Sequence, residues 1–190
     1  GADPGGTRTI VDIGGGSTQL VRPHARESWP IGCVRARELA PYDDVNAISR
    51  ELYPILSGLF GSVGNDDRQN ILRVQTGPDH RPEDLLGVGG TITTLALLCE
   101  GQAEFKPWAG EKRIESAALS AVLNTLGGMG DAARAKIPLL KDRHDVILHG
   151  GVILRFLLEL MGCKRIGATL SDGLDGYATH LFRMLSDQTY

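Results

Sequence analysis

The chain has 190 residues, of which 42% are hydrophobic and 23% are charged, and its formal net charge is −3 at pH 7. A chain of this length can bury enough apolar surface for one well-packed core, so one domain is expected. Its 20 basic and 23 acidic residues are spread along the chain, which argues against a partner that is a nucleic acid or an anionic membrane.

The first third of the chain is rich in strand signals. Residues 1–6 lack the basic and apolar regions of a secretory signal, and we interpret them as a linker or a remnant. Residues 8–13 and 17–22 favour strands on either side of three glycines, which predicts a hairpin, and residues 28–31 favour a third strand. Residues 45–60 carry apolar side chains at helical spacing, with a kink expected at Pro54.

The rest of the chain alternates between strands and helices. We expect a buried strand at 85–88, a helix at 91–99, a loop at 101–110 and a helix at 116–126 that ends at Gly127 and Gly128. Asp142 is expected to cap a helix over 143–161, with Gly162 as its stop. This apolar helix contains charged residues and is too short to span a bilayer. A strand at 165–170 and a helix at 174–185 complete a three-layer α/β domain in which a mixed sheet is flanked by helices.

The first chemical motif is a strand that ends in a carboxylate, three glycines and two hydroxyl side chains: Asp12, Gly14, Gly15, Gly16, Ser17 and Thr18. Glycines let backbone N–H groups close on phosphate oxygens, and we expect positive φ angles in this turn. Asp12 could bind Mg²⁺ directly or through water. The alternative for this motif is a plain turn that joins two strands and is capped by Asp12.

The second motif, Gly89-Gly90-Thr91, lies between the buried strand and the next helix. Free N–H groups and the positive end of the helix dipole suit an anion there. Thr91 or Thr93 could act as a cap or a ligand. A tight connection capped by threonine is the commoner explanation for such a motif on its own, but two glycine loops in one small domain favour phosphate binding.

Together these segments resemble the exopolyphosphatase/guanosine-pentaphosphate phosphohydrolase (Ppx/GppA) family. The resemblance follows the order of residues 10–21, 30–34, 87–95, 142–157 and 165–173. It implies the ribonuclease H-like fold of the actin-like ATPase and sugar-kinase superfamily, with residues 7–190 forming the second of two lobes. The glycine loops would bind phosphate, and a first lobe with the catalytic glutamate would be missing.

Two departures from the family pattern stand out. Gly173-Leu174-Asp175-Gly176 replaces a common Gly-Leu-Arg-Glu-Gly, so this tract is one residue shorter and lacks the Arg-Glu pair. Gln19 stands where a glutamate is frequent, so the negative charge of that glutamate is absent here. The phosphate loop itself is intact.

Other reactive side chains are interpreted as structural. The five histidines lack the spacing of a metal site: His24, His80, His144, His149 and His180. The three cysteines do not form an even disulfide set, which favours a reducing cytoplasm, and Cys33 is expected to be a buried thiol. Arg35 and Arg37 could reach an anion at the first glycine loop, although a solvated arginine is the commoner case.

The leading hypothesis is a hydrolase that acts on a terminal phosphoanhydride of polyphosphate or guanosine pentaphosphate, with Mg²⁺ near Asp12 and water activated from the missing lobe. The isolated chain would then be inactive, and a homodimer is compatible with this hypothesis. The alternatives are a non-catalytic lobe that senses phosphate or nucleotide and, with a poorer fit to the segment order, a superfamily kinase.

Overall fold

A computed structural model describes residues 8–22, 25–61 and 85–170. In chain order the elements are β1 (Thr9–Ile13), β2 (Thr18–Arg22), β3 (Ala25–Trp29), α1 (Cys33–Leu39), α2 (Val45–Gly61), β4 (Leu85–Val88), α4 (Gly89–Cys99), β5 (Lys112–Glu115), α5 (Ser116–Met129), α6 (Asp131–Arg134), the 3-10 helix η1 (Pro138–Leu140), α7 (Ile147–Leu160) and β6 (Arg165–Ala168). The predicted hairpin, third strand and alternating second half are confirmed, with shifts of a few residues at the ends.

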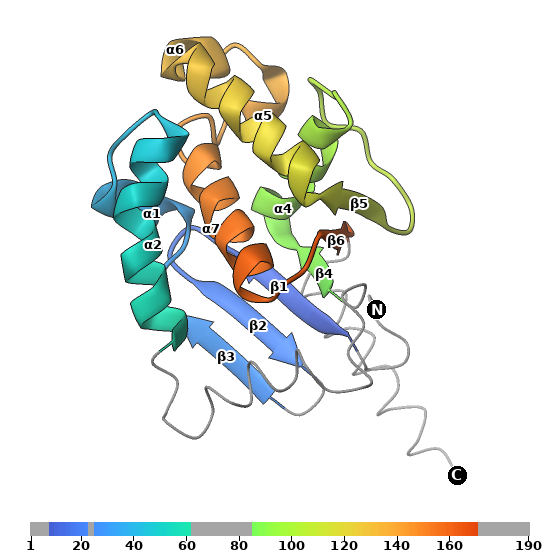
Figure 1. Ribbon diagram of the computed structural model, residues 1–190. Coiled ribbons are helices and arrows are strands. Elements are labelled where there is room, and N and C mark those ends of the chain that lie inside the picture. The colour runs from blue at the N-terminus through green and yellow to red at the C-terminus, as the bar shows by residue number, and fades with distance from the viewer. Residues whose placement is uncertain (1–7, 23–24, 62–84, 171–190) are drawn as a thin grey trace.

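The six strands form one mixed sheet in the order β3-β2-β1-β4-β6-β5 (Figure 1). Strands β1, β4 and β6 run parallel, whereas β2, β3 and β5 are antiparallel to their neighbours. Asp12 lies level with Val88, and Gly87 lies level with Ala168. Because parallel strands end at the same edge of a sheet, both glycine motifs follow strands at this edge. The expected mixed sheet flanked by helices is therefore confirmed.

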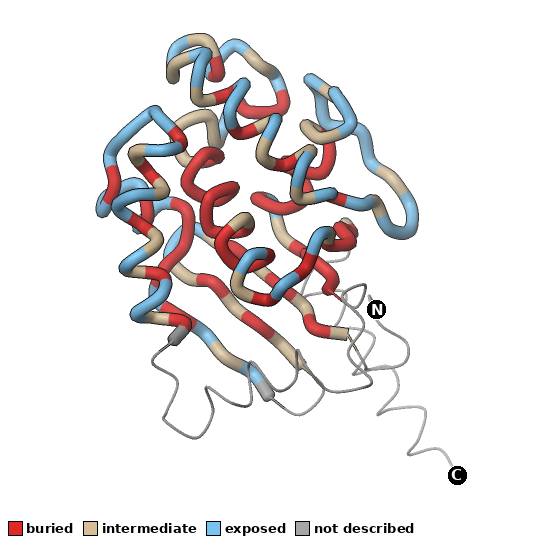
Figure 2. Tube along the Cα trace, in the orientation of Figure 1, coloured by how far each residue is buried: buried red, intermediate tan, exposed pale blue. Residues whose placement is uncertain are grey.

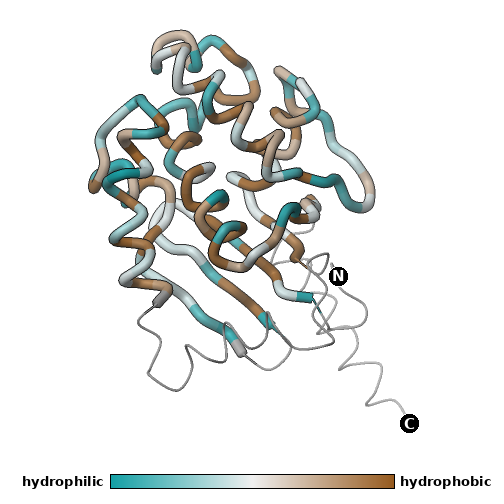
Figure 3. The backbone as a smooth tube through the Cα atoms, in the orientation of Figure 1, coloured by the Kyte–Doolittle hydropathy of each residue, from teal (hydrophilic) through white to brown (hydrophobic). Residues whose placement is uncertain are grey.

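Helix α7 is the centre of the helical layer. It crosses in front of the sheet, with α1 and α2 on one side and α4 and α5 on the other (Figure 1). Eleven of its residues are buried, and the buried and apolar colouring follows it in Figures 2 and 3. Each fully buried Val, Ile or Leu side chain contributes about 1.5–3 kcal/mol. The apolar pattern that predicted this helix thus also accounts for much of the core.

Two glycines let neighbouring helices approach α7 closely. A Cβ at Gly150 would overlap the side chain of Thr91 in α4, and one at Gly151 would overlap Leu123 in α5. These glycines therefore bring the start of α4, which carries the second glycine motif, directly against the central helix.

The structure corrects two predicted helix ends. Helix α5 continues through Gly127 and Gly128 to Met129. A Cβ at Gly127 would lie 3.0 Å from Val45 Cγ2, so close packing on α2 offsets the low helix propensity of glycine. Helix α7 begins at Ile147 and has no side-chain cap, so the prediction that Asp142 caps a helix from 143 is wrong.

A buried arginine explains the later start of α7. Arg134 is fully buried, and its guanidinium donates hydrogen bonds to the backbone oxygens of His144 and Leu126, both at 3.0 Å, and to the Asp43 carboxylate at 2.5 Å. The bond to His144 anchors the turns at residues 141–146 to this buried side chain. The predicted stop at Gly162 is confirmed, because its φ is +62°, a value that favours glycine.

Four elements were not predicted: α1, β5, α6 and η1. Helices α1 and α6 have seven and four residues, which is too short for a clear periodic signal. Residues 1–6, the predicted helix at 174–185 and the Gly173 to Gly176 tract lie outside the described residues. Within the part of the chain that the structure describes, no helix is long and apolar enough to cross a membrane.

Candidate functional site

The first glycine motif forms the loop between β1 and β2. Gly15 and Gly16 are exposed, and the Gly14 N–H donates a hydrogen bond of 2.9 Å to the Ser17 oxygen. The loop thus closes on itself at its ends and leaves its middle on the surface.

Helix α1 holds this loop by its carbonyl oxygens. The N–H groups of Cys33 and Val34 donate to the oxygens of Gly14 and Gly15, each at 2.9 Å, and Arg35 N–H donates to Gly15 at 3.3 Å. These are first-turn N–H groups, which have no partner inside their own helix. The loop carbonyls take the place of a side-chain cap, and no such cap is present on α1.

This docking decides which way the loop N–H groups point. In a trans peptide the C=O and the following N–H point in opposite directions. The Gly14 and Gly15 carbonyls face α1, so the N–H groups of Gly15 and Gly16 face away from it. Among the described residues, no backbone acceptor is found for these two N–H groups. Two outward N–H groups on an exposed turn form a nest for an anion.

Glycine is needed for space at Gly32, which lies against the loop, and the expectation of positive φ angles in the loop itself is wrong. None of Gly14, Gly15 and Gly16 has a positive φ. A Cβ at Gly15 would lie 3.3 Å from Val34 Cγ2, while one at Gly32 would overlap the oxygens of both Gly14 and Gly15. Gly32 is therefore a site residue that the sequence motifs did not single out, although it lies in the segment 30–34.

The two hydroxyl residues of the motif differ in their surroundings. Thr18 is fully buried, and its hydroxyl donates to the Ile31 oxygen at 2.5 Å. This bond ties the second strand of the hairpin to the segment before α1. Ser17 is half-buried at the end of the loop, so it is the better placed of the two hydroxyls to reach a bound anion.

Asp12 lies where the two glycine motifs meet. A Cβ at Gly89, whose φ is +82°, would overlap Asp12 Oδ1, so only glycine leaves room for the carboxylate. No ion pair to Asp12 is found within the described ranges. Burial raises the pKa of this carboxyl above its usual value. A half-buried, unpaired acid in this position is typical of a functional group.

The second glycine motif forms the first turn of α4, which begins at Gly89 and has no side-chain cap. Thr91 is buried, and its hydroxyl lies 4.0 Å from Cys33 Sγ. The Thr93 hydroxyl donates back to the Gly89 oxygen at 3.0 Å. Neither threonine acts as the cap that was considered. The backbone N–H groups and the helix dipole remain as the groups that can attract an anion.

The structure adds a cation that the sequence analysis did not select. The Arg143 guanidinium lies against Gly90, where a Cβ would overlap its Nη1 atom and lie 3.0 Å from Nη2. Arg143 stands in the turns before α7, so only the tertiary fold brings it to the start of α4. In the sequence, Arg143 could have been singled out because it lies in the segment 142–157, which resembles the family.

The two predicted arginines have different places. Arg35 Nε lies 3.9 Å from the position of a Cβ at Gly16, and its Nη1 donates to the Pro30 oxygen at 3.2 Å. Arg37 instead forms an ion pair with Asp145. Arg35 thus contributes positive charge at the first loop, whereas Arg37 links α1 to the turn before α7.

The other groups considered in the sequence are structural. Cys33 is buried, as predicted, and burial raises the pKa of its thiol. His144 contacts Asp131 and His149 is buried, while His24, His80 and His180 lie outside the described residues. Across residues 8–22, 25–61 and 85–170, no group of three or more His, Cys, Asp or Glu side chains could hold a metal.

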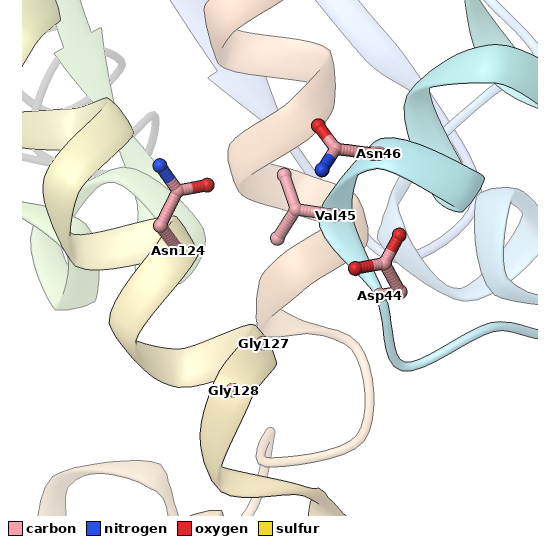
Figure 4. Close-up of a pocket in the computed structure, with 6 residues that line it drawn as sticks. All are labelled: Asp44, Val45, Asn46, Asn124, Gly127 and Gly128. Carbon is pink, nitrogen blue, oxygen red and sulfur yellow. The ribbon is translucent and has the colours of Figure 1, made fainter.

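A cavity of about 360 Å³ lies between the start of α2 and the end of α5 (Figure 4). It is lined by Asp44, Val45, Asn46, Asn124, Gly127 and Gly128. None of these residues belongs to the two glycine loops, and both amide side chains are exposed. The cavity is thus separate from the site around Asp12.

Comparisons with known proteins show the family of this chain. The model of the Ppx/GppA phosphatase family matches residues 3–172. The chain is 30% identical over 182 residues to Exopolyphosphatase 2 of Mycobacterium tuberculosis, an alignment that covers 90% of the chain and 54% of that protein. The chain therefore spans about half the length of this relative.

Solved structures show the same fold. A Ppx/GppA family member from Aquifex aeolicus matches with a TM-score of 0.71 and 23% identity, over 96% of this chain and 57% of that one. An exopolyphosphatase-like protein matches with a TM-score of 0.75 and 23% identity, over 96% of this chain and 62% of that one.

Proposed function

Because this chain belongs to the Ppx/GppA phosphatase family, we propose that it is the phosphate-binding lobe of a hydrolase that cleaves terminal phosphoanhydride bonds. The observation that carries the proposal is the orientation of the first loop, in which the Gly15 and Gly16 N–H groups face outward beside Asp12. Polyphosphate or guanosine pentaphosphate is the proposed substrate, and the name of the mycobacterial relative favours polyphosphate.

Each of the two loops, with one arginine beside it, would bind a different anionic group of the substrate. The first loop offers N–H groups to the oxygens of one phosphate, and Arg35 beside Gly16 adds positive charge. The start of α4 offers N–H groups to a second anionic group, with Arg143 beside Gly90. Catalysis of phosphoryl transfer depends mainly on such positioning and charge stabilisation.

Asp12 fits a role in binding Mg²⁺. This ion usually takes one or two protein carboxylates and fills its other positions with water and substrate phosphates, so a single unpaired carboxylate between two anion loops is a suitable donor. A bound Mg²⁺ would neutralise charge on the phosphate chain. Asp12 would hold the Mg²⁺ at the junction of the two loops. Ionising this carboxyl in its half-buried position costs free energy, because burial raises its pKa.

The group that activates water is proposed to lie in a preceding lobe. The chain covers 54% of the mycobacterial relative, which leaves room for such a lobe, and we propose that the chain alone binds phosphate but turns it over poorly. The three cysteines are unpaired, which supports a cytoplasmic location.

The proposal is tested by titrating tripolyphosphate into the 190-residue chain with and without Mg²⁺, followed by calorimetry. We expect saturable binding that Mg²⁺ strengthens. Polyphosphate hydrolysis is then compared between this chain and a longer protein that carries it. Full turnover by the chain alone would contradict the two-lobe proposal, and absence of binding would contradict the phosphate site.

A non-catalytic sensor is the second candidate, because the sequence at Gly173-Leu174-Asp175-Gly176 departs from the family pattern. It predicts phosphate binding in the longer protein without hydrolysis of polyphosphate or guanosine pentaphosphate. The same pair of assays separates the two functions.

A further inference from the structure

Helix α1 is the support of the first glycine loop, but it is too short to hold a position by itself. It has seven residues, of which only Cys33 and Ala36 are buried. Helices well below about 12 residues are marginal in water, so the position of α1 depends on the contacts at its two ends. Its first end is the contact with the Gly14 and Gly15 carbonyls described above.

The second end of α1 is held by a buried histidine. His149, in the first turn of α7, is only 1% exposed, and its Nε2 lies 2.8 Å from the Ala40 oxygen. A carbonyl can only accept, so Nε2 carries the proton and donates this bond. Tyr42 N–H also donates to the same oxygen at 2.7 Å. His149 is therefore not required to satisfy Ala40 but joins the end of α1 to the central helix.

A surface ion pair supports the same connection. Arg37 in α1 pairs with Asp145 in the turn before α7, two residues from the Arg143 that lies against Gly90. Residues 143–149 thus contact both the support of the first loop and the start of the second.

We propose that His149 is a positioning residue for the Gly14 to Gly16 loop, and that it acts through α1. The imidazole fixes the end of α1, and α1 in turn fixes the loop carbonyls and hence the direction of the loop N–H groups. As a statement about binding this rests on the proposed function. As a statement about loop geometry it stands on the contacts alone.

The test compares two substitutions of His149 with a matched control. His149→Gln keeps an N–H donor at a similar reach, whereas His149→Leu removes it. Leu158→Ala changes a buried residue in the last turn of α7 and has no contact with Ala40 among the interactions described. Two quantities are measured on each folded variant: the amide NMR shifts of Gly15 and Gly16, and the dissociation constant of tripolyphosphate with Mg²⁺.

We expect His149→Leu to move both amide signals and to weaken tripolyphosphate binding by about tenfold, the scale of one misaligned hydrogen bond to an anion. His149→Gln should stay within about twofold of wild type, and Leu158→Ala should lose thermal stability without moving the two amides. A merely structural role predicts that His149→Leu behaves like Leu158→Ala, and this result would overturn the inference.

The two proposals can fail separately. Wild-type protein that does not bind tripolyphosphate contradicts the proposed function, while the amide shifts still decide whether His149 sets the loop. If His149→Leu does not fold, Asp145→Asn, at a partly exposed residue, carries the test. We then expect the same two amides to move and binding to weaken by about twofold, as suits a surface ion pair, and unchanged amide shifts would overturn the inference.

Discussion

Replacing Gly32 by alanine tests how α1 supports the first glycine loop. An added Cβ would overlap the carbonyl oxygens of Gly14 and Gly15, which are backbone atoms and cannot rotate away. Either the loop moves off α1, or the start of α1 moves off the loop. In both cases the hydrogen bonds from Cys33, Val34 and Arg35 to the loop lengthen or break.

The loss in the free energy of unfolding is set by the less costly of two ways in which the structure can accommodate the added Cβ. Breaking three backbone hydrogen bonds at about 1 kcal/mol each costs about 3 kcal/mol, while absorbing one extra methyl group in a packed site costs about 1–3 kcal/mol. We therefore expect a loss of about 1–3 kcal/mol in the free energy of unfolding, or about 2–4 °C of melting temperature per kcal/mol. Misdirected N–H groups at Gly15 and Gly16 should weaken phosphate binding by tenfold or more, since a hydrogen bond to a charged group is worth about 1.5–3 kcal/mol.

The assay is calorimetric titration of tripolyphosphate with Mg²⁺, at a temperature where circular dichroism shows the variant to be folded. Gly58→Ala is the matched control, because no atom lies within 4 Å of an added Cβ there. Gly58 lies near the C-terminal end of α2, where this change should stabilise the chain by up to about 0.5–1 kcal/mol and leave binding unchanged. A folded Gly32→Ala protein with wild-type affinity would refute the claim that α1 directs the loop.

Three further predictions concern single groups of the site. In a longer protein that carries both lobes, Asp12→Ala should lower Mg²⁺-dependent turnover by ~100-fold or more. In the chain alone, Asp12→Asn should raise stability near neutral pH, because a raised carboxyl pKa means that ionisation of Asp12 opposes folding as pH rises through that pKa. A fall in melting temperature would contradict this. Gly15→Val should abolish tripolyphosphate binding, because a Cβ there would lie 3.3 Å from Val34 Cγ2 in α1 and a branched side chain would push the loop and its N–H groups out of place. Its cost in stability should be below the ~1–3 kcal/mol of backbone strain, since the φ of Gly15 is not positive. Unchanged calorimetric affinity would remove this loop from the site. Burial lowers the pKa of His149 below 6.5, and the positive charges of Arg37 and Arg134 act in the same direction against the opposing charge of Asp43. The free energy of unfolding should therefore have its full value above pH 6.5 and fall as pH drops from 6.5 toward the folded pKa. His149→Gln should flatten this dependence in thermal scans, and an unaltered pH profile would argue against it.

Several features of the fold could be predicted because they depend on local preferences. The β1–β2 hairpin follows from β-rich segments around glycines, and α7 follows from its apolar periodicity. The start of α7 could not be predicted, because the buried Arg134 holds residues 141–146 through partners in distant segments. The end of α5 was missed for a similar reason, since contact with Val45 keeps Gly127 in the helix.

The amino-acid sequence was enough to predict the two glycine motifs, the carboxylate at Asp12 and the order of strands and helices, whereas the parallel pairing of β1 with β4 brings both motifs to one sheet edge. The predicted features depend on residue type and local backbone geometry, which a linear pattern records. The tertiary structure alone decided that Gly32 and α1 turn the loop N–H groups outward, that the hydroxyl of Thr18 is used inside the fold, and that Arg143 reaches Gly90. The direction of backbone groups and the distance between segments far apart in the sequence depend on packing. Helix propensity does not predict a seven-residue helix whose position is set by its neighbours.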